Sequence, residues 1–165
     1  LGYIYLRRKV FHLSCFWNIV YYSWYYSSKL QSKQMTKIFK TEEEWKQKLS
    51  EDEFLITRKK GTEPPFSGKK FNSDKEGYFK CICCDEILFH SNCKYESNSG
   101  WPSFFESYSN ECISKEIDKS HGMTRTEVLC SNCDSHLGHL FDDGPQPTGK
   151  RYCINSLSLK FEEVE

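Results

Sequence analysis

Apolar and polar side chains alternate through the last part of this chain, between Lys150 and Phe161. Successive residues of a β-strand point to opposite faces of its sheet. The alternation therefore predicts a strand whose one face carries Arg151, Cys153 and Asn155 and continues with apolar residues. A guanidinium beside a thiol lowers the thiol's pKa from about 8.5 and favours the nucleophilic thiolate. We therefore expect a reactive cysteine at Cys153.

The pattern upstream predicts a mainly β domain with little helix. Thr41 and Glu44 form a capping box ahead of apolar residues at helical spacing, so a short helix is expected over residues 41–50. Turns rich in Gly and Pro interrupt regular structure over residues 61–65 and 142–149. Short strands are predicted, in chain order, over Tyr78–Cys81, Ile87–His90, Glu127–Cys130, Leu137–Phe141 and Tyr152–Phe161.

Residues 1–40 differ in kind from the rest of the chain. They are rich in aromatic side chains and hold seven Lys or Arg residues but no Asp or Glu. A basic start with an apolar middle is typical of a secretory or organellar presequence. Alternatively, translation starts at Met35 after translated non-coding sequence, or the segment is a disordered or surface-packed extension. We expect an N-terminal extension over residues 1–40 and one domain over residues 41–165, an ordinary domain length.

The charge of the chain argues against nucleic-acid partners. The 23 basic and 23 acidic residues balance overall. Residues 41–165, however, contain 16 Lys and Arg residues and all 23 acidic residues, which gives this part a net charge of −7. Nucleic-acid binding rests on the neutralisation of phosphates by basic side chains. No apolar run in the sequence reaches the roughly 18 residues of a membrane span, so we expect neither a nucleic acid nor a membrane as partner.

Two C-x-x-C pairs predict a structural zinc site. Cys81 and Cys84 form the first pair, and Cys130 and Cys133 form the second. Four thiolates in a tetrahedral arrangement are a ligand set of structural zinc. Because 45 residues separate the pairs, the ion would join two hairpins of a larger domain, unlike a zinc ribbon with its loop of about 15–20 residues. Cys83 competes with Cys84, whose spacing matches the second pair. Disulfides or a thioredoxin-like redox pair are the alternatives.

Two further groups of residues accompany the thiol. His136 and His139 are either surface histidines, a metal site or, since histidine titrates near neutrality, an acid or base for Cys153. The run Gly100–Phe105 is rich in aromatic residues and indicates either the wall of a binding site or ordinary core. Together with Cys153 and Arg151, the two histidines are the residue types of a reactive-thiol site.

The whole of the expected domain resembles the B-type methionine sulfoxide reductases, which reduce the R epimer of methionine sulfoxide. The resemblance runs from about residue 42 to residue 161 and leaves residues 1–40 uncovered. It rests on the two cysteine pairs and on Gly61–Phe66, Lys94–Ser97, Gly100–Phe104, Ser120–Met123, His136–His139, Asp143–Gly149 and Arg151–Ser156. It implies antiparallel β-sheets, stapled by zinc, that form a β-barrel-like or β-tent core with short N-terminal helices.

The resemblance also implies a role for each residue of the site. Cys153 matches the nucleophile, whose thiolate attacks the sulfoxide sulfur, releases methionine and becomes a sulfenic acid. His139 matches the acid that protonates the leaving oxygen. Trp101 would pack against the S-methyl group, so the other epimer would bury an unpaired oxygen at a cost of about 1–3 kcal/mol. Arg151 would stabilise the thiolate, His136, Asp143 and Asn155 would orient substrate or water, Phe141 would close the pocket, and Cys81, Cys84, Cys130 and Cys133 would bind zinc.

One position departs from the family pattern. Many members carry a resolving cysteine directly before the Gly-Trp-Pro run, where this chain has Ser99. A hydroxyl cannot attack the sulfenic acid to form a disulfide. We therefore expect a one-cysteine cycle or an atypical resolving thiol, with thioredoxin, glutaredoxin or a small thiol as reductant. The spare thiols are Cys93 and Cys112, with Cys83 and Cys15 as weaker candidates.

Two other classes of function compete with the reductase. A zinc-stapled binding module without catalysis would explain the cysteine pairs but not the face around Cys153 or the Trp101 wall. A disulfide reductase would use one C-x-x-C as its redox pair. The family preference makes oxidised proteins the expected substrates, whose repair would be the function. Cysteines committed to metal and catalysis favour a reducing compartment, cytoplasmic if translation starts at Met35 and organellar or secretory if residues 1–40 are a presequence.

Overall fold

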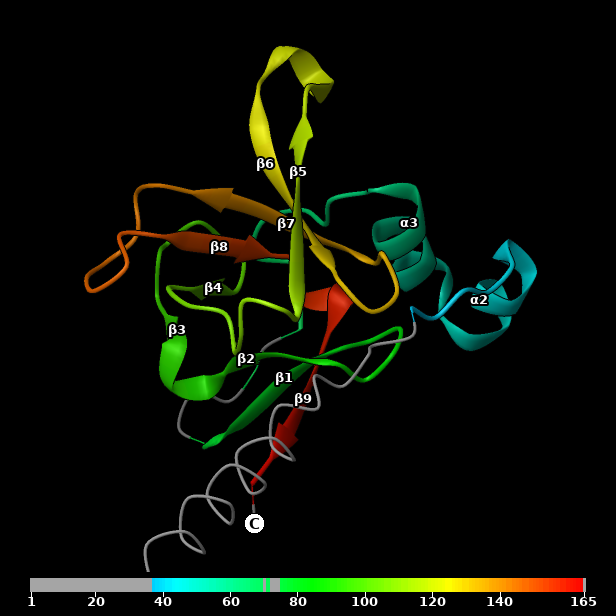
Figure 1. Ribbon diagram of the computed structural model, residues 1–165, viewed down its shortest axis with the longest axis horizontal. Helices are drawn as coiled ribbons and strands as arrows, with labels where there is room; N and C mark the ends of the chain where they lie inside the picture. The colour runs from blue at the N-terminus through cyan, green and yellow to red at the C-terminus, as the bar shows by residue number, and fades with distance from the viewer. Residues whose placement is uncertain (1–36, 70, 72–74, 165) are drawn as a thin grey trace, which may run out of the picture. The chain divides into compact units, whose positions relative to one another are not determined.

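The structure, a computed structural model, describes residues 37–69, 71 and 75–164. The described residues form two helices and two antiparallel sheets (Figure 1). The helices are α2 (Glu42–Lys48) and α3 (Glu51–Lys59). The strands are β1 (Gly77–Cys81), β2 (Ile87–His90), β3 (Lys94–Tyr95), β4 (Ser103–Phe104), β5 (Ile113–Asp118), β6 (Arg125–Cys130), β7 (His136–Phe141), β8 (Arg151–Ile154) and β9 (Leu159–Glu163). The expectations for residues 1–36, Cys15 and Met35 included, lie outside the described part.

Both helices begin with a capping box. At α2, the Thr41 hydroxyl accepts a hydrogen bond from the Glu44 N–H, and the Glu44 carboxylate accepts one from the Thr41 N–H. Ser50 and Glu53 repeat this arrangement at α3. The predicted first helix is confirmed. The second helix was not predicted from the residue pattern, although its capping box is present in the sequence, and the family resemblance implied more than one helix.

The core lies between the two sheets. The smaller sheet has the strand order β2-β1-β9, and the larger has the order β3-β4-β8-β7-β6-β5. Phe79 of β1 and Phe89 of β2 pack against Phe104 of β4, with ring centroids 4.9 and 4.2 Å from that of Phe104. The expected mainly β, antiparallel fold is confirmed. Among the described strands neither sheet closes on itself, so the barrel-like closure is not observed.

The strand predictions hold except at the end of the chain. The runs predicted upstream of residue 150 correspond to β1, β2, β6 and β7, whereas β3, β4 and β5 were not predicted. The single strand Tyr152–Phe161 is wrong. The chain leaves the larger sheet at Ile154, passes through a 3-10 turn at Ser156–Ser158 and pairs with β1 in the smaller sheet as β9. The cause is the buried Glu63 carboxylate, which accepts the backbone N–H groups of Ser156 and Leu157 and so bends the chain.

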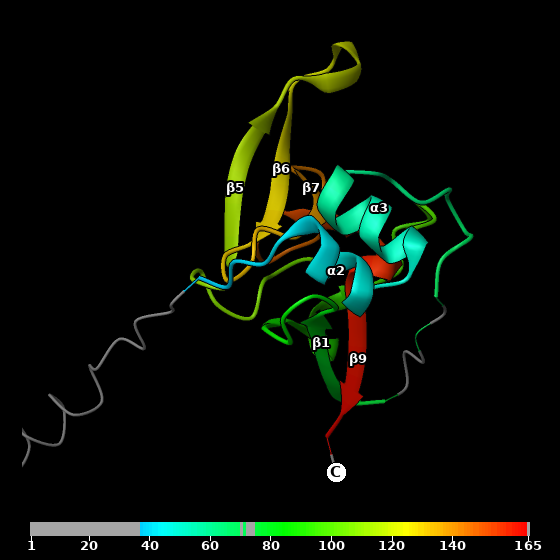
Figure 2. The same ribbon diagram turned by 90° about the vertical axis from the view of Figure 1, so that its right-hand side faces the viewer.

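The hairpin of β5 and β6 extends away from the rest of the fold (Figures 1 and 2). Asp118 ends β5 and is paired with Arg125, which begins β6. The two helices lie on the side of the larger sheet where α3 packs against β7. Neither described helix is long and apolar enough to cross a membrane.

Candidate active site

Cys153 lies in the middle of the larger sheet. Its strand, β8, runs between β4 and β7, and Cys153 is directly opposite Ser103 on one side and His139 on the other. Residues directly opposite one another on neighbouring antiparallel strands point to the same face of the sheet. Strand pairing therefore places the His139 imidazole beside the thiol, although 14 positions separate the two residues in the chain.

A cavity of about 110 Å³ lies next to Cys153. It is lined by Thr62, Trp101, Arg125, Gly138, His139, Phe141, Cys153 and Asn155. Five residues that the sequence assigned to the site thus come together, because the cavity contains the nucleophile candidate, one of the two histidines, the amide and both aromatic residues. Arg151, Asp143 and His136 do not line it.

The Cys153 thiol is partly buried, and burial raises its pKa. Two neighbours act in the opposite direction. The Ser99 hydroxyl oxygen lies 3.9 Å from the Cys153 sulfur, and the Arg151 charge also favours the thiolate. Burial is the largest of these effects, so the pKa of the thiol lies above its ordinary value. The Arg151 guanidinium thus acts on the pKa in the expected direction, but burial of the thiol outweighs it.

Arg151 is paired with Asp143. The guanidinium donates from Nε and Nη2 to the two Asp143 oxygens, each at 2.8 Å, and its central carbon lies 4.4 Å from the centre of the Phe141 ring. Pairing with Arg151 lowers the pKa of Asp143. Because the two charges oppose each other at short range, Arg151 acts on the Cys153 thiol more weakly than a free cation would. The paired guanidinium also packs against the Phe141 ring.

The two histidines occupy different environments. His139 lines the cavity, with its Nε2 2.7 Å from Asp118 Oδ2. His136 is buried, with its Nδ1 2.7 Å from Glu127 Oε1, and burial lowers the pKa of His136. The ring centres are 5.6 Å apart. Neither ring belongs to the one metal-ligand cluster found among the described residues. His136 therefore packs next to the His139 ring and supports it. His136 does not line the cavity.

Glu63 connects the aromatic wall to the strand that carries the thiol. The Trp101 indole N–H donates to the Glu63 carbonyl at 3.0 Å. The Glu63 N–H in turn donates to Asn155 Oδ1 at 3.1 Å, and Asn155 Nδ2 donates to the Leu137 carbonyl at 3.1 Å. The polar atoms of Trp101 and Asn155 are thus used to hold their side chains in place, and the Trp101 ring forms a wall of the cavity.

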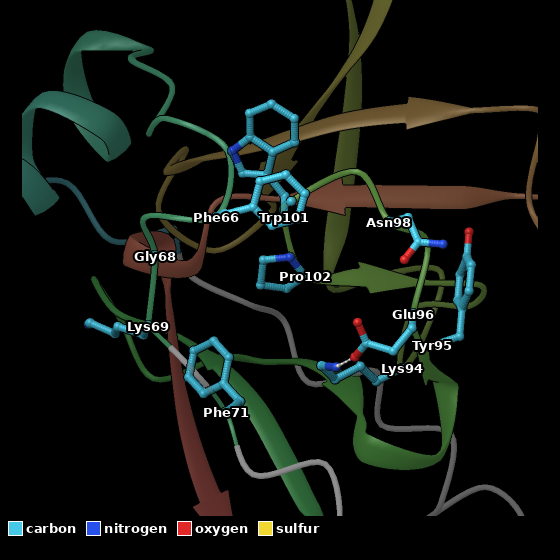
Figure 3. Close-up of a pocket in the computed structure, with 11 residues that line it drawn as sticks. Phe66, Gly68, Lys69, Phe71, Lys94, Tyr95, Glu96, Asn98, Trp101 and Pro102 are labelled. Atoms are coloured by element: carbon cyan, nitrogen blue, oxygen red, sulfur yellow. Dashed lines mark hydrogen bonds and ion pairs between the residues drawn. The ribbon is translucent and has the colours of Figure 1, made fainter.

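A second, larger hollow shares Trp101 with the cavity. It has a volume of about 470 Å³ and is bordered by Phe66, Phe71 and Pro102 (Figure 3). Phe66 is 75% exposed. Charged groups on its margin are Lys69, Lys94 and Glu96. An apolar surface open to solvent therefore continues from the Trp101 wall.

The four cysteines of the C-x-x-C pairs form one cluster. Cys81, Cys84, Cys130 and Cys133 are free thiols whose sulfur atoms all lie within 4.8 Å of one another. The sulfurs of Cys81 and Cys133 are 3.7 Å apart, and those of Cys84 and Cys130 are 3.5 Å apart. Four sulfurs about 2.3 Å from a tetrahedral ion lie about 3.8 Å from one another. The donor set and its spacing therefore fit a metal ion bound by four thiolates, and disulfides are absent at these positions.

The two turns that present these cysteines have the same backbone geometry. In the first, the Asp85 N–H donates to the Cys81 carbonyl at 2.9 Å, and in the second the Asp134 N–H donates to the Cys130 carbonyl at 2.9 Å. Both aspartates are left-handed, with φ of 65° and 56°. Cys84 and Cys133 therefore occupy equivalent positions. The Cys83 thiol is instead 3.5 Å from the Ser135 hydroxyl, so the structure places Cys84 and not Cys83 in the cluster.

The cluster joins the two sheets. Its first turn connects β1 to β2, and its second connects β6 to β7. The helices reinforce both turns, because Lys48 Nζ donates to the Cys83 carbonyl at 2.7 Å and Arg58 Nη1 donates to the Cys133 carbonyl at 2.8 Å. The four cysteines of the expected staple thus lie together where the two hairpin turns meet.

Comparison with known proteins identifies the family of this chain. The family model of the SelR domain matches residues 49–163. The chain belongs to the SelR domain family. Among curated proteins, it is 53% identical to the peptide methionine sulfoxide reductase MsrB of Hahella chejuensis over 131 residues, which cover 79% of this chain and 94% of the relative. Proteins of the same name from Acinetobacter baylyi and Acinetobacter baumannii are 52% and 50% identical over the same shares of both chains.

A solved Mis18 'Yippee-like' domain also resembles this SelR domain. The TM-score is 0.45 at 16% identity, over 55% of this chain and 99% of that domain. A likeness this weak carries no conclusion about the fold or the site.

Sequence reasoning missed several polar residues of this SelR domain. Arg125 and Thr62 line the cavity, and Asp118 contacts His139. Asp118 and Arg125 flank the run Ser120–Met123, which was noticed only as a family motif. Their significance depends on the pairing of β5 with β6, and β5 was not predicted. The Asp that follows each C-x-x-C pair was a usable signal that the two turns are alike.

Proposed function

We propose that Cys153 is the nucleophile with which this SelR-domain enzyme, a peptide-methionine (R)-S-oxide reductase, reduces methionine sulfoxide. The observation that carries the proposal is the small cavity in which Cys153, His139 and Trp101 meet. A thiol, a group that can give a proton and an apolar wall are what the reduction of a sulfoxide requires. The family and its relatives support the activity.

The reaction proceeds through a sulfenic acid. The Cys153 thiolate attacks the sulfoxide sulfur while His139 protonates the oxygen, since an unprotonated oxide is too basic to leave. The S–O bond of the substrate then breaks with loss of water, which leaves the Cys153 sulfur bonded to the substrate sulfur as a sulfonium. A water molecule attacks the Cys153 sulfur, the S–S bond breaks, methionine and a proton leave, and Cys153 remains as the sulfenic acid. Because burial raises the pKa of the free thiol, the Ser99 hydroxyl and the Arg151 guanidinium serve to lower the cost of forming the thiolate in the occupied site.

The choice of the R epimer follows from the two sides of the cavity. Trp101 and Phe141 offer apolar rings to the S-methyl group, and His139 offers a polar group to the oxygen. Asn155 orients the site through its hydrogen bonds to Glu63 and Leu137. The S epimer exchanges methyl and oxygen, so an oxygen would be buried against the rings at a cost of about 1–3 kcal/mol. Asp143 contributes by holding the Arg151 guanidinium in place. His136 contributes by packing against the His139 ring.

Oxidised proteins are the proposed substrates, and repair of such proteins is the proposed role. The cavity of about 110 Å³ takes a single side chain, while the hollow bordered by Phe66 and Phe71 offers apolar surface to neighbouring residues of the same polypeptide. Thioredoxin or another thiol returns Cys153 to the reduced state. The lining of the cavity holds no second described cysteine, which supports a one-cysteine cycle.

The cysteine cluster is proposed to bind one structural zinc ion. Zinc supplies a rigid tetrahedral link between the turn of β1 and β2 and the turn of β6 and β7, through Cys81, Cys84, Cys130 and Cys133. We assign residues 41–165 to the catalytic domain, which contains every residue of the cavity and of the cluster.

The experiment that tests the proposed function is a stereospecific assay. Purified protein is incubated with the R or the S epimer of a methionine sulfoxide peptide, with dithiothreitol and then with thioredoxin as reductant, and methionine is quantified. We expect turnover of the R epimer alone. Turnover of only the S epimer, or of neither epimer by zinc-loaded protein, would overturn the proposal.

A further inference from the structure

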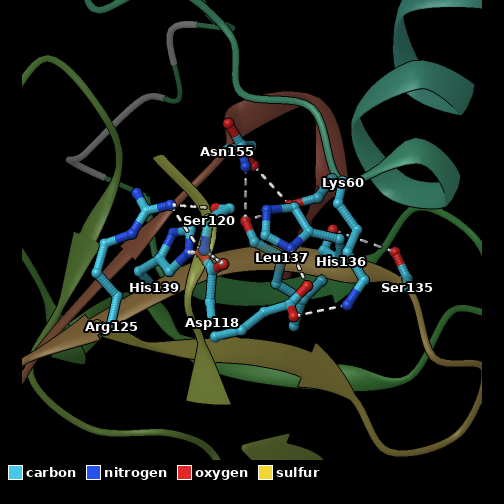
Figure 4. A network of polar contacts seen from close by, with 11 residues as sticks. Lys60, Asp118, Ser120, Arg125, Ser135, His136, Leu137, His139 and Asn155 are labelled. Atoms are coloured by element: carbon cyan, nitrogen blue, oxygen red, sulfur yellow. Dashed lines mark hydrogen bonds and ion pairs between the residues drawn. The ribbon is translucent and has the colours of Figure 1, made fainter. Parts of the chain in front are cut away.

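Three polar side chains of the extended hairpin converge on His139. Asp118 ends β5, Arg125 begins β6, and Ser120 lies in the turn between them. Figure 4 shows these side chains around the His139 ring. The exposed fractions of the side chains of Asp118, Arg125 and His139 are 15%, 21% and 12%. The group is therefore more enclosed than an ordinary surface ion pair.

The contacts in this group are directed at one carboxylate. Asp118 Oδ2 lies 2.7 Å from His139 Nε2 and 2.7 Å from Arg125 Nη2. Asp118 Oδ1 accepts the Ser120 N–H at 2.8 Å, and Arg125 Nη2 also lies 3.2 Å from the Ser120 hydroxyl. Ser120 and Arg125 thus fix the position of the Asp118 carboxylate that contacts the imidazole.

These contacts determine which ring nitrogen of His139 carries a proton. The hydrogen bonds from Ser120, together with those from His139 and the charge of Arg125, lower the pKa of Asp118 far below its usual range. An ionised carboxylate can only accept hydrogen bonds. His139 Nε2 must therefore donate to Asp118, and the neutral ring has its free electron pair at Nδ1. The partner of one ring nitrogen sets the tautomer of the other.

No other carboxylate of the described residues contacts the His139 ring. Glu127 is opposite His139 on β6, but its oxygens lie 2.7 Å from His136 Nδ1 and from Lys60 Nζ. The remaining ionisable neighbours are Cys153 on β8, the His136 ring and Arg125 itself. A negative charge next to an imidazole favours its protonated form. In this surrounding, Asp118 is the one described carboxylate in contact with the His139 ring.

We propose that Asp118 is the positioning residue of His139. It fixes the imidazole with Nε2–H as the permanent donor, so that Nδ1 gains and gives the proton used in the reaction, and Arg125 and Ser120 hold Asp118 in place. The inference rests on the proposed function, in which His139 protonates the sulfoxide oxygen. It assigns a task to the end of the β5–β6 hairpin, which also places Arg125 in the lining of the cavity.

The variant Asp118→Asn tests the charge while it keeps an oxygen at the same place. We expect the rate of the first turnover on the R epimer, measured by rapid quench, to fall about 10- to 100-fold. The pH–rate profile should also differ from that of the wild type, because the variant carries no carboxylate charge beside the ring. Asp52→Asn, which alters an exposed carboxylate in the first turn of α3, is the matched control and should leave rate and profile unchanged.

A double-variant comparison separates this inference from the proposed function. If Asp118 acts through His139, adding Asp118→Asn to His139→Asn should cause no further loss of rate. A slow His139→Asn protein together with an Asp118→Asn protein of normal rate and pH profile would overturn the inference and leave the proposed function intact. A His139→Asn protein of normal rate would overturn the role of His139 and the inference with it.

The tautomer provides a readout that needs no variant. In protein labelled with ¹⁵N at histidine, two-bond ¹H–¹⁵N correlations at a pH where the ring is neutral should show His139 protonated at Nε2. Protonation at Nδ1 would overturn the inference, even if the Asp118→Asn protein did not fold.

Discussion

The indole nitrogen of Trp101 donates a hydrogen bond of 3.0 Å to the backbone carbonyl of Glu63. The side-chain carboxylate of Glu63 accepts hydrogen bonds from the N–H groups of Ser156 and Leu157, at 2.6 and 3.2 Å. Glu63 is buried, with 4% of the residue exposed. Glu63 thereby ties the wall of the cavity to the turn that follows the Cys153 strand. Glu63 lies outside the cavity and holds the Trp101 side of the cavity to the Cys153 side.

Replacing Glu63 should therefore destabilise the protein. In Glu63→Gln, an amide NH₂ takes the place of one oxygen and faces backbone N–H donors, which leaves a buried donor without an acceptor. We expect the free energy of unfolding to fall by about 1–3 kcal/mol, as measured by urea denaturation of the zinc-loaded protein. Glu43→Gln, at an exposed position in the first turn of α2, is the control. Equal stability of the two variants would contradict this account.

Ser99 is close enough to the nucleophile to act as a resolving residue if it carried sulfur. Its oxygen lies 3.9 Å from the Cys153 sulfur. We expect Ser99→Cys, after oxidation by one equivalent of the R epimer, to form a disulfide with Cys153 that mass spectrometry of peptides detects. Ser97→Cys is the matched control, because the Ser97 hydroxyl contacts Ser99 and Ser103 rather than the thiol. A Ser99→Cys protein that accumulated only the sulfenic acid would show that the geometry is wrong.

Part of the site was predictable because its chemistry is carried by local patterns. Two C-x-x-C pairs and an alternating strand with a thiol are visible without a fold. The chain's exit from the larger sheet at Ile154 was not predictable, because it depends on Glu63, which is 91 positions upstream of that residue. The effect of the Arg151 charge on Cys153 was not predictable either. Its closeness to Cys153 followed from strand periodicity, but its pairing with Asp143 and the burial of the thiol are tertiary effects.

The Asp143 carboxylate counteracts Arg151, and removing its charge should make the thiol more reactive. Asp143 raises the pKa of Cys153 and pairs with the guanidinium that lowers it. In Asp143→Asn, both effects favour the thiolate, so the pKa of Cys153 should fall. At a fixed pH below that pKa, we expect iodoacetamide to alkylate Cys153 about three- to tenfold faster than in the wild type.

The neighbouring variant Asp142→Asn is the control for this measurement. Asp142 pairs with Lys150 at the surface and has no described contact with Arg151. Its alkylation rate should match that of the wild type. Slower alkylation of the Asp143→Asn protein would mean that Asp143 helps to form the thiolate rather than opposing it.

The cysteine cluster predicts opposite outcomes for two adjacent thiols. Cys84→Ser removes one of four clustered sulfurs, so we expect loss of bound zinc and a large drop in the unfolding temperature. Cys83→Ser should retain about one zinc per chain, because Cys83 contacts the Ser135 hydroxyl and lies outside the cluster. Metal content is measured by plasma mass spectrometry after dialysis. Loss of zinc from Cys83→Ser with retention in Cys84→Ser would reverse the assignment.

The central claim is that Cys153 is the residue that the substrate oxidises to a sulfenic acid. Reduced protein is mixed with one equivalent of a peptide that contains the R epimer, without reductant and with dimedone present to trap sulfenic acids, and the labelled cysteine is identified by mass spectrometry. The account predicts close to one methionine per protein and a dimedone label on Cys153, with neither product in Cys153→Ser. A label on another cysteine, or a full yield of methionine from Cys153→Ser, would contradict it.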